Sequence, residues 1–314
     1  MADAVPGNEA TEALDQARLV HAVLTQPPAK SRGLLVLVVS LALFAASMQN
    51  GGSWRELVVL VAVVVVHELG HLVAMRAFGF SDLRMFFVPF FGAAASGRKP
   101  GAGATEHALV ALAGPLPGLL VALAIVLVEA PRWVGFGLNP LLVDVTWMLV
   151  ILNGFNLLPI LPFDGGRVFQ ELLFARAPWL DVLFRIVAIG GVGWFAWRGM
   201  TVFGVVAAFM VIALPQRARV AFAVARLRRE RSLPPEPEQL TVEELQAVFA
   251  TAESTVPERL TPENRARVLV GAVRDVFDGA ARAQASVLAT LSLVLLWGAA
   301  VALAFVEVVW LLRG

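Results

Sequence analysis

The chain has 314 residues, of which 58% are hydrophobic, and its mean hydropathy is +0.76. Ordinary globular domains are about 45–50% apolar, so much of the apolar surface of this chain must face lipid. The formal net charge is only +1, which provides no bulk field for binding nucleic acid. The chain contains no cysteine, which excludes disulfides and thiolate metal sites.

A polar head precedes the first apolar segment. Residues 1–32 carry Asp3, Glu9, Glu12 and Asp15 and no apolar core. A signal peptide would need a basic start and an apolar middle, and neither is present. We expect a cytoplasmic head that need not be ordered.

Seven apolar segments follow along the chain. They cover residues 33–48, 57–75, 109–128, 141–160, 182–197, 200–214 and 287–312. A helix that spans a bilayer needs about 20 residues, and the first, fifth and sixth segments are shorter than that. The sequence predicts an all-α polytopic membrane protein with about six or seven transmembrane helices. The fifth and sixth segments are expected to form a hairpin that turns at Arg198 and Gly199.

Residues 215–285 differ from the rest because they are charged and contain a proline-rich break at 233–237. Thr241 and Glu244 have the spacing of a capping box, and Pro262 suits the first position of a further helix. We expect a small helical cytoplasmic insert that is too short to bury a large core alone. The predicted domains are a head over 1–32, a membrane core over 33–214, this insert over 215–285 and a C-terminal transmembrane helix over 286–314.

Basic residues alternate between the two ends of successive segments. One side carries Lys30, Arg32, Arg76, Arg84, Arg98, Lys99, Arg167, Arg176 and the arginines from 217 to 231, and the other carries Arg55, Arg132 and Arg198. Loops rich in Lys and Arg stay in the cytoplasm, so this pattern predicts a cytoplasmic N-terminus. We expect a multi-pass protein of the cell (inner) membrane.

Two histidines and a glutamate interrupt the second apolar segment. In the motif His67-Glu68-Leu69-Gly70-His71, the histidines are four residues apart, so both imidazoles share a helix face and can meet one ion. This is the H-E-x-x-H arrangement of zinc hydrolases, in which the glutamate reaches a water molecule bound to the metal. An acidic side chain near a helix centre costs about 2.5–3.5 kcal/mol on insertion scales, which a divalent cation would offset. The alternative is a buried polar cluster that holds helices together.

A catalytic zinc site needs a third protein ligand. His21 lies in the polar head, and His107 begins the third segment, where a histidine is more often an interface residue than a ligand. Asp164 is the better candidate, because Pro159 and Pro162 break the fourth helix just before it and leave the carboxylate at the membrane edge. An ordinary Asp-Gly turn is the alternative, but the two histidines of the motif are expected on the same side of the membrane.

These motifs resemble those of the site-2 proteases, zinc enzymes that cut within membranes. The resemblance rests on the sequence HELGH at 67–71 and on NLLP at 156–159 followed by DG at 164–165. The sequence AGP at 113–115, on the helix between them, is also similar to the family. The resemblance covers about residues 57–170.

The resemblance implies that His67, His71 and Asp164 hold Zn²⁺ and that Glu68 is the general base. Asn156 falls where the family has an asparagine that contacts substrate or the developing oxyanion. The implied activity is hydrolysis of peptide bonds in or near transmembrane segments, as in regulated intramembrane proteolysis. The expected partners are single-span membrane-protein substrates and the lipid bilayer, with a regulatory membrane partner as a further expectation and no nucleic acid.

Residues 80–97, between the second and third segments, are aromatic and are interrupted by Pro89 and Gly92. They predict a small membrane-edge hairpin or loop. An edge strand there would capture an unwound substrate by backbone pairing, and the alternative is a lipid-dipping loop without substrate contact. No insert large enough for a PDZ domain lies between the motifs, so substrate selection must come from elsewhere.

Other function classes stay open. A metal transporter also carries His and Asp in membrane helices, but it needs polar sites along a path, and the sequence shows one cluster. A non-catalytic membrane scaffold related to the family would lack Glu68 or a ligand, and none is missing. A prenyl-processing zinc protease shares H-E-x-x-H, but its third ligand is usually a glutamate on a helix, whereas Asp164 follows a proline break.

Overall fold

The computed structural model describes residues 6–25, 33–48, 53–88, 92–99, 101–129, 139–199 and 201–313. These residues divide into two compact units, which we call the sheet unit and the helical unit. The sheet unit comprises the described residues of Lys30–Lys99, Ala104–Leu172 and Ala285–Gly314. The helical unit comprises the described residues of Met1–Ala29, Pro100–Gly103 and Leu173–Gln284.

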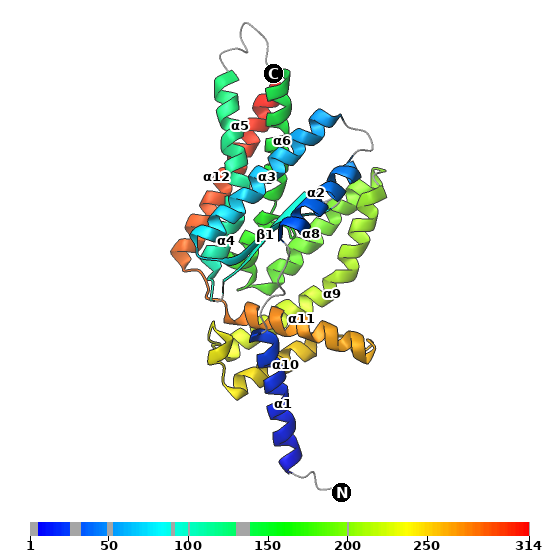
Figure 1. The fold of residues 1–314 in the computed structure, drawn as a ribbon, viewed down its shortest axis with the longest axis vertical. Helices are drawn as coiled ribbons and strands as arrows, with labels where there is room; N and C mark the ends of the chain where they lie inside the picture. Colours follow the sequence, from blue (N-terminus) through cyan, green and yellow to red (C-terminus); the bar gives the residue numbers. More distant parts are fainter. Residues whose placement is uncertain are drawn as a thin grey trace. The chain divides into compact units, whose positions relative to one another are not determined.

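The sheet unit is a set of apolar helices with one small hairpin. Its elements are α2 (Gly33–Met48), α3 (Trp54–Ala77), β1 (Ser81–Val88), β2 (Gly92–Arg98), α4 (Ala104–Ala113), α5 (Pro115–Glu129), α6 (Pro140–Asn156), α7 (Asp164–Phe169) and α12 (Val287–Arg313). α5 and α6 contact each other, and each contacts both α3 and α12 (Figure 1). The core between these helices is built around Val63, Ala122, Leu149 and Leu311.

Local sequence signals explain where these helices begin. Ser53 and Glu56 exchange side-chain and backbone hydrogen bonds, and this capping box starts α3. Asn139 caps α6 in front of Pro140, which has no amide hydrogen to leave unpaired. The 26-residue apolar stretch Ala104–Glu129 is divided into α4 and α5 just before Pro115.

Within the described part of the chain, four helical stretches are long and apolar enough to cross a membrane. They are Trp54–Ala77, Ala104–Glu129, Gly204–Glu230 and Val287–Arg313, and the apolar α6 is shorter. The chain therefore has the helices of a polytopic integral membrane protein, as predicted. Each predicted apolar segment lies mainly within a helix, but some of these helices are short, with 16 residues in α2, so the number of spans stays a prediction.

The hairpin predicted between the second and third apolar segments is confirmed. β1 and β2 pair in antiparallel register, with Met85 opposite Ala95. The Phe87 amide of β1 donates to the Ser40 hydroxyl of α2 at 2.9 Å, which ties β1 to that helix. Pro89 lies outside the described residues, and the position of the hairpin at the membrane edge stays a prediction.

The helical unit is built from α1 (Pro6–Thr25), α8 (Pro178–Trp197), α9 (Thr201–Glu230), the 3-10 turn η3 (Pro237–Gln239), α10 (Val242–Thr255) and α11 (Pro262–Ala281). α8 and α9 form the predicted helical hairpin, which turns at Arg198 and at Gly199, where φ is +97°. Thr241 and Glu244 form the predicted capping box of α10, and Pro262 begins α11.

Helix α9 runs without a break through Pro215. It thus crosses the boundary predicted between residues 214 and 215, and it joins the sixth apolar segment to the charged start of the insert. The helix then contacts both α10 and α11.

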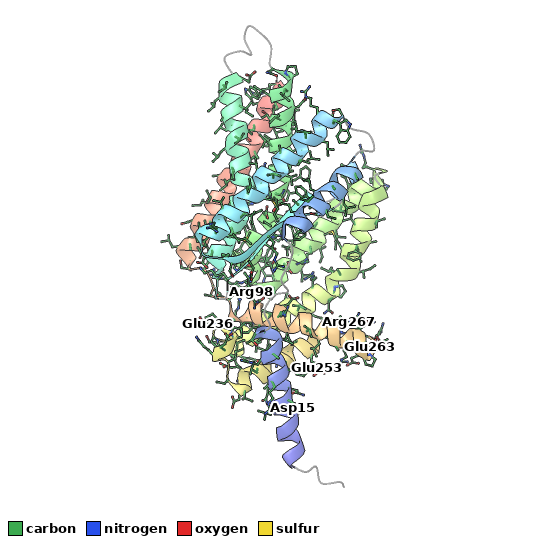
Figure 2. All side chains as sticks on the ribbon, in the orientation of Figure 1. Asp15, Arg98, Glu236, Glu253, Glu263 and Arg267 are labelled. Carbon is green, nitrogen blue, oxygen red and sulfur yellow. The ribbon has the colours of Figure 1, made fainter. Side chains whose placement is uncertain are left out.

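Residues 6–25 of the polar head, for which the sequence required no ordered structure, form helix α1. Ala17, Val20 and Leu24 are buried in one core with residues of α10 and α11. Their i, i+3, i+7 spacing places them on one helix face, which supplies the apolar surface that the insert lacks by itself. Figure 2 shows charged side chains such as Asp15 and Glu253 on the outside of these helices.

Replacing Leu24, which is 4% exposed, by alanine should destabilise the helical unit by about 2–5 kcal/mol, because it leaves a cavity in this core. Leu19→Ala is the matched control, since Leu19 is 48% exposed on the same helix. Thermal unfolding of the full chain in detergent, followed by protease sensitivity around residues 231–241, measures the effect. Equal sensitivity of both variants and the parent would show that α1 does not stabilise this core.

Candidate metal centre

Helix α3 buries the two predicted histidine ligands and the predicted base. His67, Glu68 and His71 are 4%, 5% and 4% exposed, although the helix is apolar along most of its length. The four-residue spacing brings both imidazoles to one helix face, with ring centroids 4.9 Å apart.

Asp164 reaches the same point from a different element. α6 ends at Asn156, and the chain passes through turns as far as Phe163 before α7 begins at Asp164. Pro159 and Pro162 in this stretch have no amide hydrogen to donate, so α6 cannot continue. The helix break predicted before Asp164 is confirmed, and the aspartate side chain is buried.

Three ligand atoms converge in this cluster. His67 Nε2 and His71 Nε2 lie 3.0 Å and 3.2 Å from Asp164 Oδ2, and 3.2 Å from each other. A tetrahedral zinc ion with ligand distances of about 2.0–2.1 Å holds its ligand atoms roughly 3.3 Å apart. The triangle therefore fits zinc with little adjustment. Among the described residues, His67, His71 and Asp164 form the one cluster of at least three His or carboxylate side chains that could hold a metal ion.

Hydrogen bonds at Nδ1 set the tautomers of both rings. His71 Nδ1 donates at 2.8 Å to the carbonyl of Val110, in the last turn of α4, where the helix leaves its carbonyls unpaired. Asn153 Nδ2 donates to the Leu149 carbonyl at 2.7 Å, so the Asn153 Oδ1 accepts from His67 Nδ1 at 2.9 Å. Each Nε2 therefore directs a lone pair at the same point, as metal-binding histidines do.

Glycines give these polar side chains the space they need. A Cβ at Gly114 would lie 2.3 Å from the His71 ring, and a Cβ at Gly118 would lie 2.1 Å from Asn153 Nδ2. A side chain at either position would displace a ligand or the residue that orients one. Gly114 in the sequence Ala113-Gly114-Pro115 thus leaves the space that the His71 ring of the histidine motif occupies.

Glu68 lies beside the triangle of ligand atoms. Its carboxylate interacts electrostatically with His67, His71 and Asp164 and accepts a hydrogen bond from the backbone of Ala95 in β2. Glu68 Oε2 and Asp164 Oδ2 are buried and have no hydrogen-bond partner among the described residues. Buried oxygens without partners are costly, so this site suits a cation and a water molecule.

Two other candidates from the sequence lie outside the triangle. His107 packs edge-on against Phe80, with ring centroids 5.6 Å apart, and does not belong to the metal-binding group. Asn156 Nδ2 donates to the Leu152 carbonyl, one turn back on α6, at 2.9 Å. The predicted contact of Asn156 with substrate or oxyanion stays a prediction.

Two residues that support the site were not among those predicted from the sequence. Asn153 orients His67. A polar amide in the middle of the apolar segment 141–160 was the sequence feature that could have identified it. Trp297 of α12 donates from Nε1 to the Leu157 carbonyl at 2.8 Å and packs its ring against Phe169. This bond holds the start of the segment that leads to Asp164. No sequence pattern pairs Trp297 with that segment.

Comparison with known proteins gives two relatives in sequence, although no family model matches the chain. A zinc metalloprotease of Methanocaldococcus jannaschii is 29% identical over 147 residues, which are 46% of this chain and 41% of the relative. Rip3 of Mycobacterium tuberculosis, named provisionally as a zinc metalloprotease, is 35% identical over 130 residues, 38% of this chain and 31% of the relative. The matched part of the chain thus spans less than half the length of either relative.

Among solved structures, the site-2 protease from Methanocaldococcus jannaschii aligns with 60% of this chain and 93% of its own, at 21% identity and a TM-score of 0.40. Both sequence relatives are named as zinc metalloproteases, the broader class to which the paired motifs point.

Replacing Asn153 by leucine should lower zinc affinity about 10–100-fold, because His67 loses the hydrogen bond that orients its ring. Asn156→Leu is the matched control, since among the described residues Asn156 bonds to its own helix, at the Leu152 carbonyl, and its replacement should keep parental affinity. Competition with a zinc chelator measures both constants. An equal loss in the two variants would contradict the orienting role of Asn153.

Proposed function

Because the chain resembles the site-2 proteases in both metal-binding motifs, we propose that it is an intramembrane zinc metalloprotease. It hydrolyses peptide bonds in or near transmembrane segments of single-span membrane proteins, as in regulated intramembrane proteolysis. The observation that carries the proposal is the buried triangle of His67, His71 and Asp164, beside which Glu68 Oε2 has no hydrogen-bond partner among the described residues. The zinc metalloprotease relatives support the choice of metal.

The roles of the side chains follow from their positions. When bound, zinc lowers the pKa of a bound water to about 7 and polarises a carbonyl. Glu68 takes a proton from the attacking water and gives it to the leaving amine. Its carboxylate is suited to this work because one oxygen is held by the backbone of Ala95 while Oε2 is unpaired among the described residues. Asn156 is proposed to contact the developing oxyanion.

The hairpin offers a route for presenting substrate to Glu68. The Phe87 amide of β1 is bound to Ser40 of α2, while Ala95 of β2 is bound to Glu68. β2 therefore lies beside the base. We propose that an unwound substrate segment pairs with β2, which would bring its backbone to the metal centre. A hairpin that only dips into lipid is the alternative.

Replacing Glu68 by glutamine should keep about one zinc per chain but lower cleavage at least about 10²–10⁴-fold, because the proton acceptor is lost. Asp164→Ala is the contrasting variant, which should lose both zinc and cleavage. Elemental analysis of purified protein gives the zinc content, and co-expression with candidate single-span membrane proteins gives cleavage.

The outcomes separate the function classes. Near-parental cleavage by Glu68→Gln would reject Glu68 as the base, and full zinc content in Asp164→Ala would reject Asp164 as a ligand. Zinc uptake into vesicles by the parent without any cleavage would favour a metal transporter. Neither uptake nor cleavage by the zinc-loaded parent would favour a membrane scaffold.

The arginine distribution leads us to propose that the active site opens toward the cytoplasm. Ser96 of β2 and Asp144 of α6 are both exposed, and Asp144 is ion-paired with Arg55 near the start of α3. Since the native chain has no cysteine, a single Ser96→Cys should react with a membrane-impermeant thiol reagent only after cells are opened. A single Asp144→Cys should react in intact cells. The reverse labelling pattern would overturn the proposed orientation.

A further inference from the structure

Helix α7, which begins at the metal ligand Asp164, has one exposed residue. The side chain of Arg167 is 51% exposed, whereas the other five residues of the helix are buried. The roles proposed above leave this arginine unused, although it follows a metal ligand by less than one helical turn.

The rotation of α7 about its axis is fixed by its two glycines. A Cβ at Gly165 or at Gly166 would collide with the backbone of residues 157–161, so these turns of chain pack directly against one side of the helix. Asp164 and Arg167 are three residues apart and therefore share another side. The packing that directs Asp164 at the two histidines thus also keeps Arg167 beside the metal centre.

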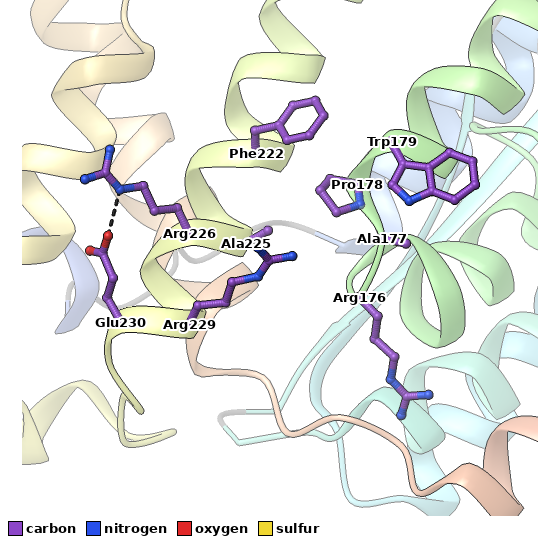
Figure 3. Close-up of a pocket in the computed structure, with 9 residues that line it drawn as sticks. All are labelled: Arg176, Ala177, Pro178, Trp179, Phe222, Ala225, Arg226, Arg229 and Glu230. Atoms are coloured by element: carbon purple, nitrogen blue, oxygen red, sulfur yellow. Dashed lines mark hydrogen bonds and ion pairs between the residues drawn. The ribbon is translucent and has the colours of Figure 1, made fainter.

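The two carboxylate oxygens of Asp164 face different groups. Oδ2 lies 3.0 Å from His67 Nε2, in the triangle of ligand atoms, and Oδ1 lies 3.6 Å from Arg167 Nη1. That second distance is too long for a hydrogen bond. By contrast, Arg226 of α9 donates to Glu230 at 2.7 Å (Figure 3).

The Arg167 guanidinium therefore has donors to spare. It forms no other ion pair and no hydrogen bond with the residues that the structure describes. A guanidinium carries five N–H donors in a planar fork that matches the two oxygens of a carboxylate.

A group at the open position of a catalytic zinc site would lie next to this guanidinium. Such a site keeps a fourth position for water or substrate, and the ligands of a tetrahedral ion are roughly 3.3 Å apart. The occupant would thus be a neighbour of Asp164 Oδ2, while Arg167 lies beside the other oxygen of the same carboxylate. The long and loosely held arginine side chain needs only a small rotation to reach that occupant.

Hydrolysis of a peptide bond places negative charge on the oxygens of the carbonyl carbon. A C–O bond to water forms and the C–N bond breaks, the proton passes through Glu68 to the leaving amine, and the new C-terminus is a carboxylate. Asp164 is an anion and cannot donate to these oxygens. Donors that are already in place where such charge develops stabilise the transition state.

We propose that Arg167 is a further catalytic residue, which donates hydrogen bonds to the two oxygens of the reacting carbonyl carbon and then to the product carboxylate. Its own protons stay in place throughout the reaction. This inference rests on the proposed proteolysis. The competing role is that of a positioning residue, in which Arg167 only holds Oδ1 of Asp164.

Binding of acetate to the Co²⁺-loaded full chain in detergent tests the proposal without requiring cleavage. Acetate has the two oxygens of the product carboxylate, imidazole is the neutral comparison ligand, and the visible spectrum of the cobalt reports both. Arg167→Gln should weaken acetate binding at least about tenfold, the loss expected for one charge-assisted hydrogen bond, and leave imidazole binding unchanged. Arg167→Lys, which keeps the charge without the planar fork, should recover part of the acetate affinity.

Arg76→Gln is the matched control, because Arg76 is exposed in the last turn of α3, five residues after His71. This variant should bind acetate like the parent, and Arg167→Gln should keep parental zinc affinity in competition with a chelator. Parental acetate binding by Arg167→Gln, or equal losses in both variants, would overturn the proposal. A loss of zinc affinity of about 10–100-fold in Arg167→Gln would overturn it in favour of the positioning role.

The cleavage assay separates this proposal from the proteolysis on which it rests. Arg167→Gln should lower kcat about 10²–10³-fold with little change in KM, because the contact strengthens in the transition state. A higher KM with parental kcat would reject the catalytic role of Arg167 alone. A parent that discriminates acetate as expected but cleaves no substrate would reject the proteolysis, and the catalytic role with it.

Discussion

The metal centre depends on three ligand atoms, two from imidazoles and one from a carboxylate, that lie within 3.2 Å of one another and are buried among apolar helices. Because both imidazoles use Nδ1 as the donor, the two Nε2 atoms and the Asp164 oxygen are all acceptors and cannot satisfy each other. A cation satisfies all three at once, which couples metal binding to the stability of the site. The Asp164 carboxylate and the two imidazoles would be costly to bury in a membrane without a cation, and the bound cation would offset that cost.

Packing around the ligands follows from that constraint. His71 fits against α4 only because position 114 is glycine, and Asn153 fits against α5 only because position 118 is glycine. A side chain at either position would collide with His71 or Asn153, so the helices could not approach as closely as they do. Small residues at helix contacts therefore shape the metal centre, because they set how closely polar side chains from different helices approach one another.

The motifs describe only part of what holds the site. The resemblance ends near residue 170, yet Trp297 of the last helix donates to Leu157 and so supports the turn that leads to Asp164. In the helical unit, α1 from the polar head completes the core of the insert, with Val20 fully buried. In both cases residues far apart in the chain supply what a segment cannot supply for itself.

The sequence by itself predicted the apolar segments, a hairpin or loop between the motifs, the helix starts at Thr241 and Pro262, and the pairing of His67 with His71. These features are local, because hydropathy, capping residues and the spacing of two histidines act within a few turns of chain. Asp164 is distant in sequence, and its choice as the third ligand rested on the proline break before it and on the resemblance to the site-2 proteases. Only the tertiary structure decided that Asn153 orients His67, that Trp297 supports the Asp164 segment, and that the head forms a helix in the core of the insert. Those contacts join residues that are distant in sequence, and their strength depends on burial and geometry that no local pattern records.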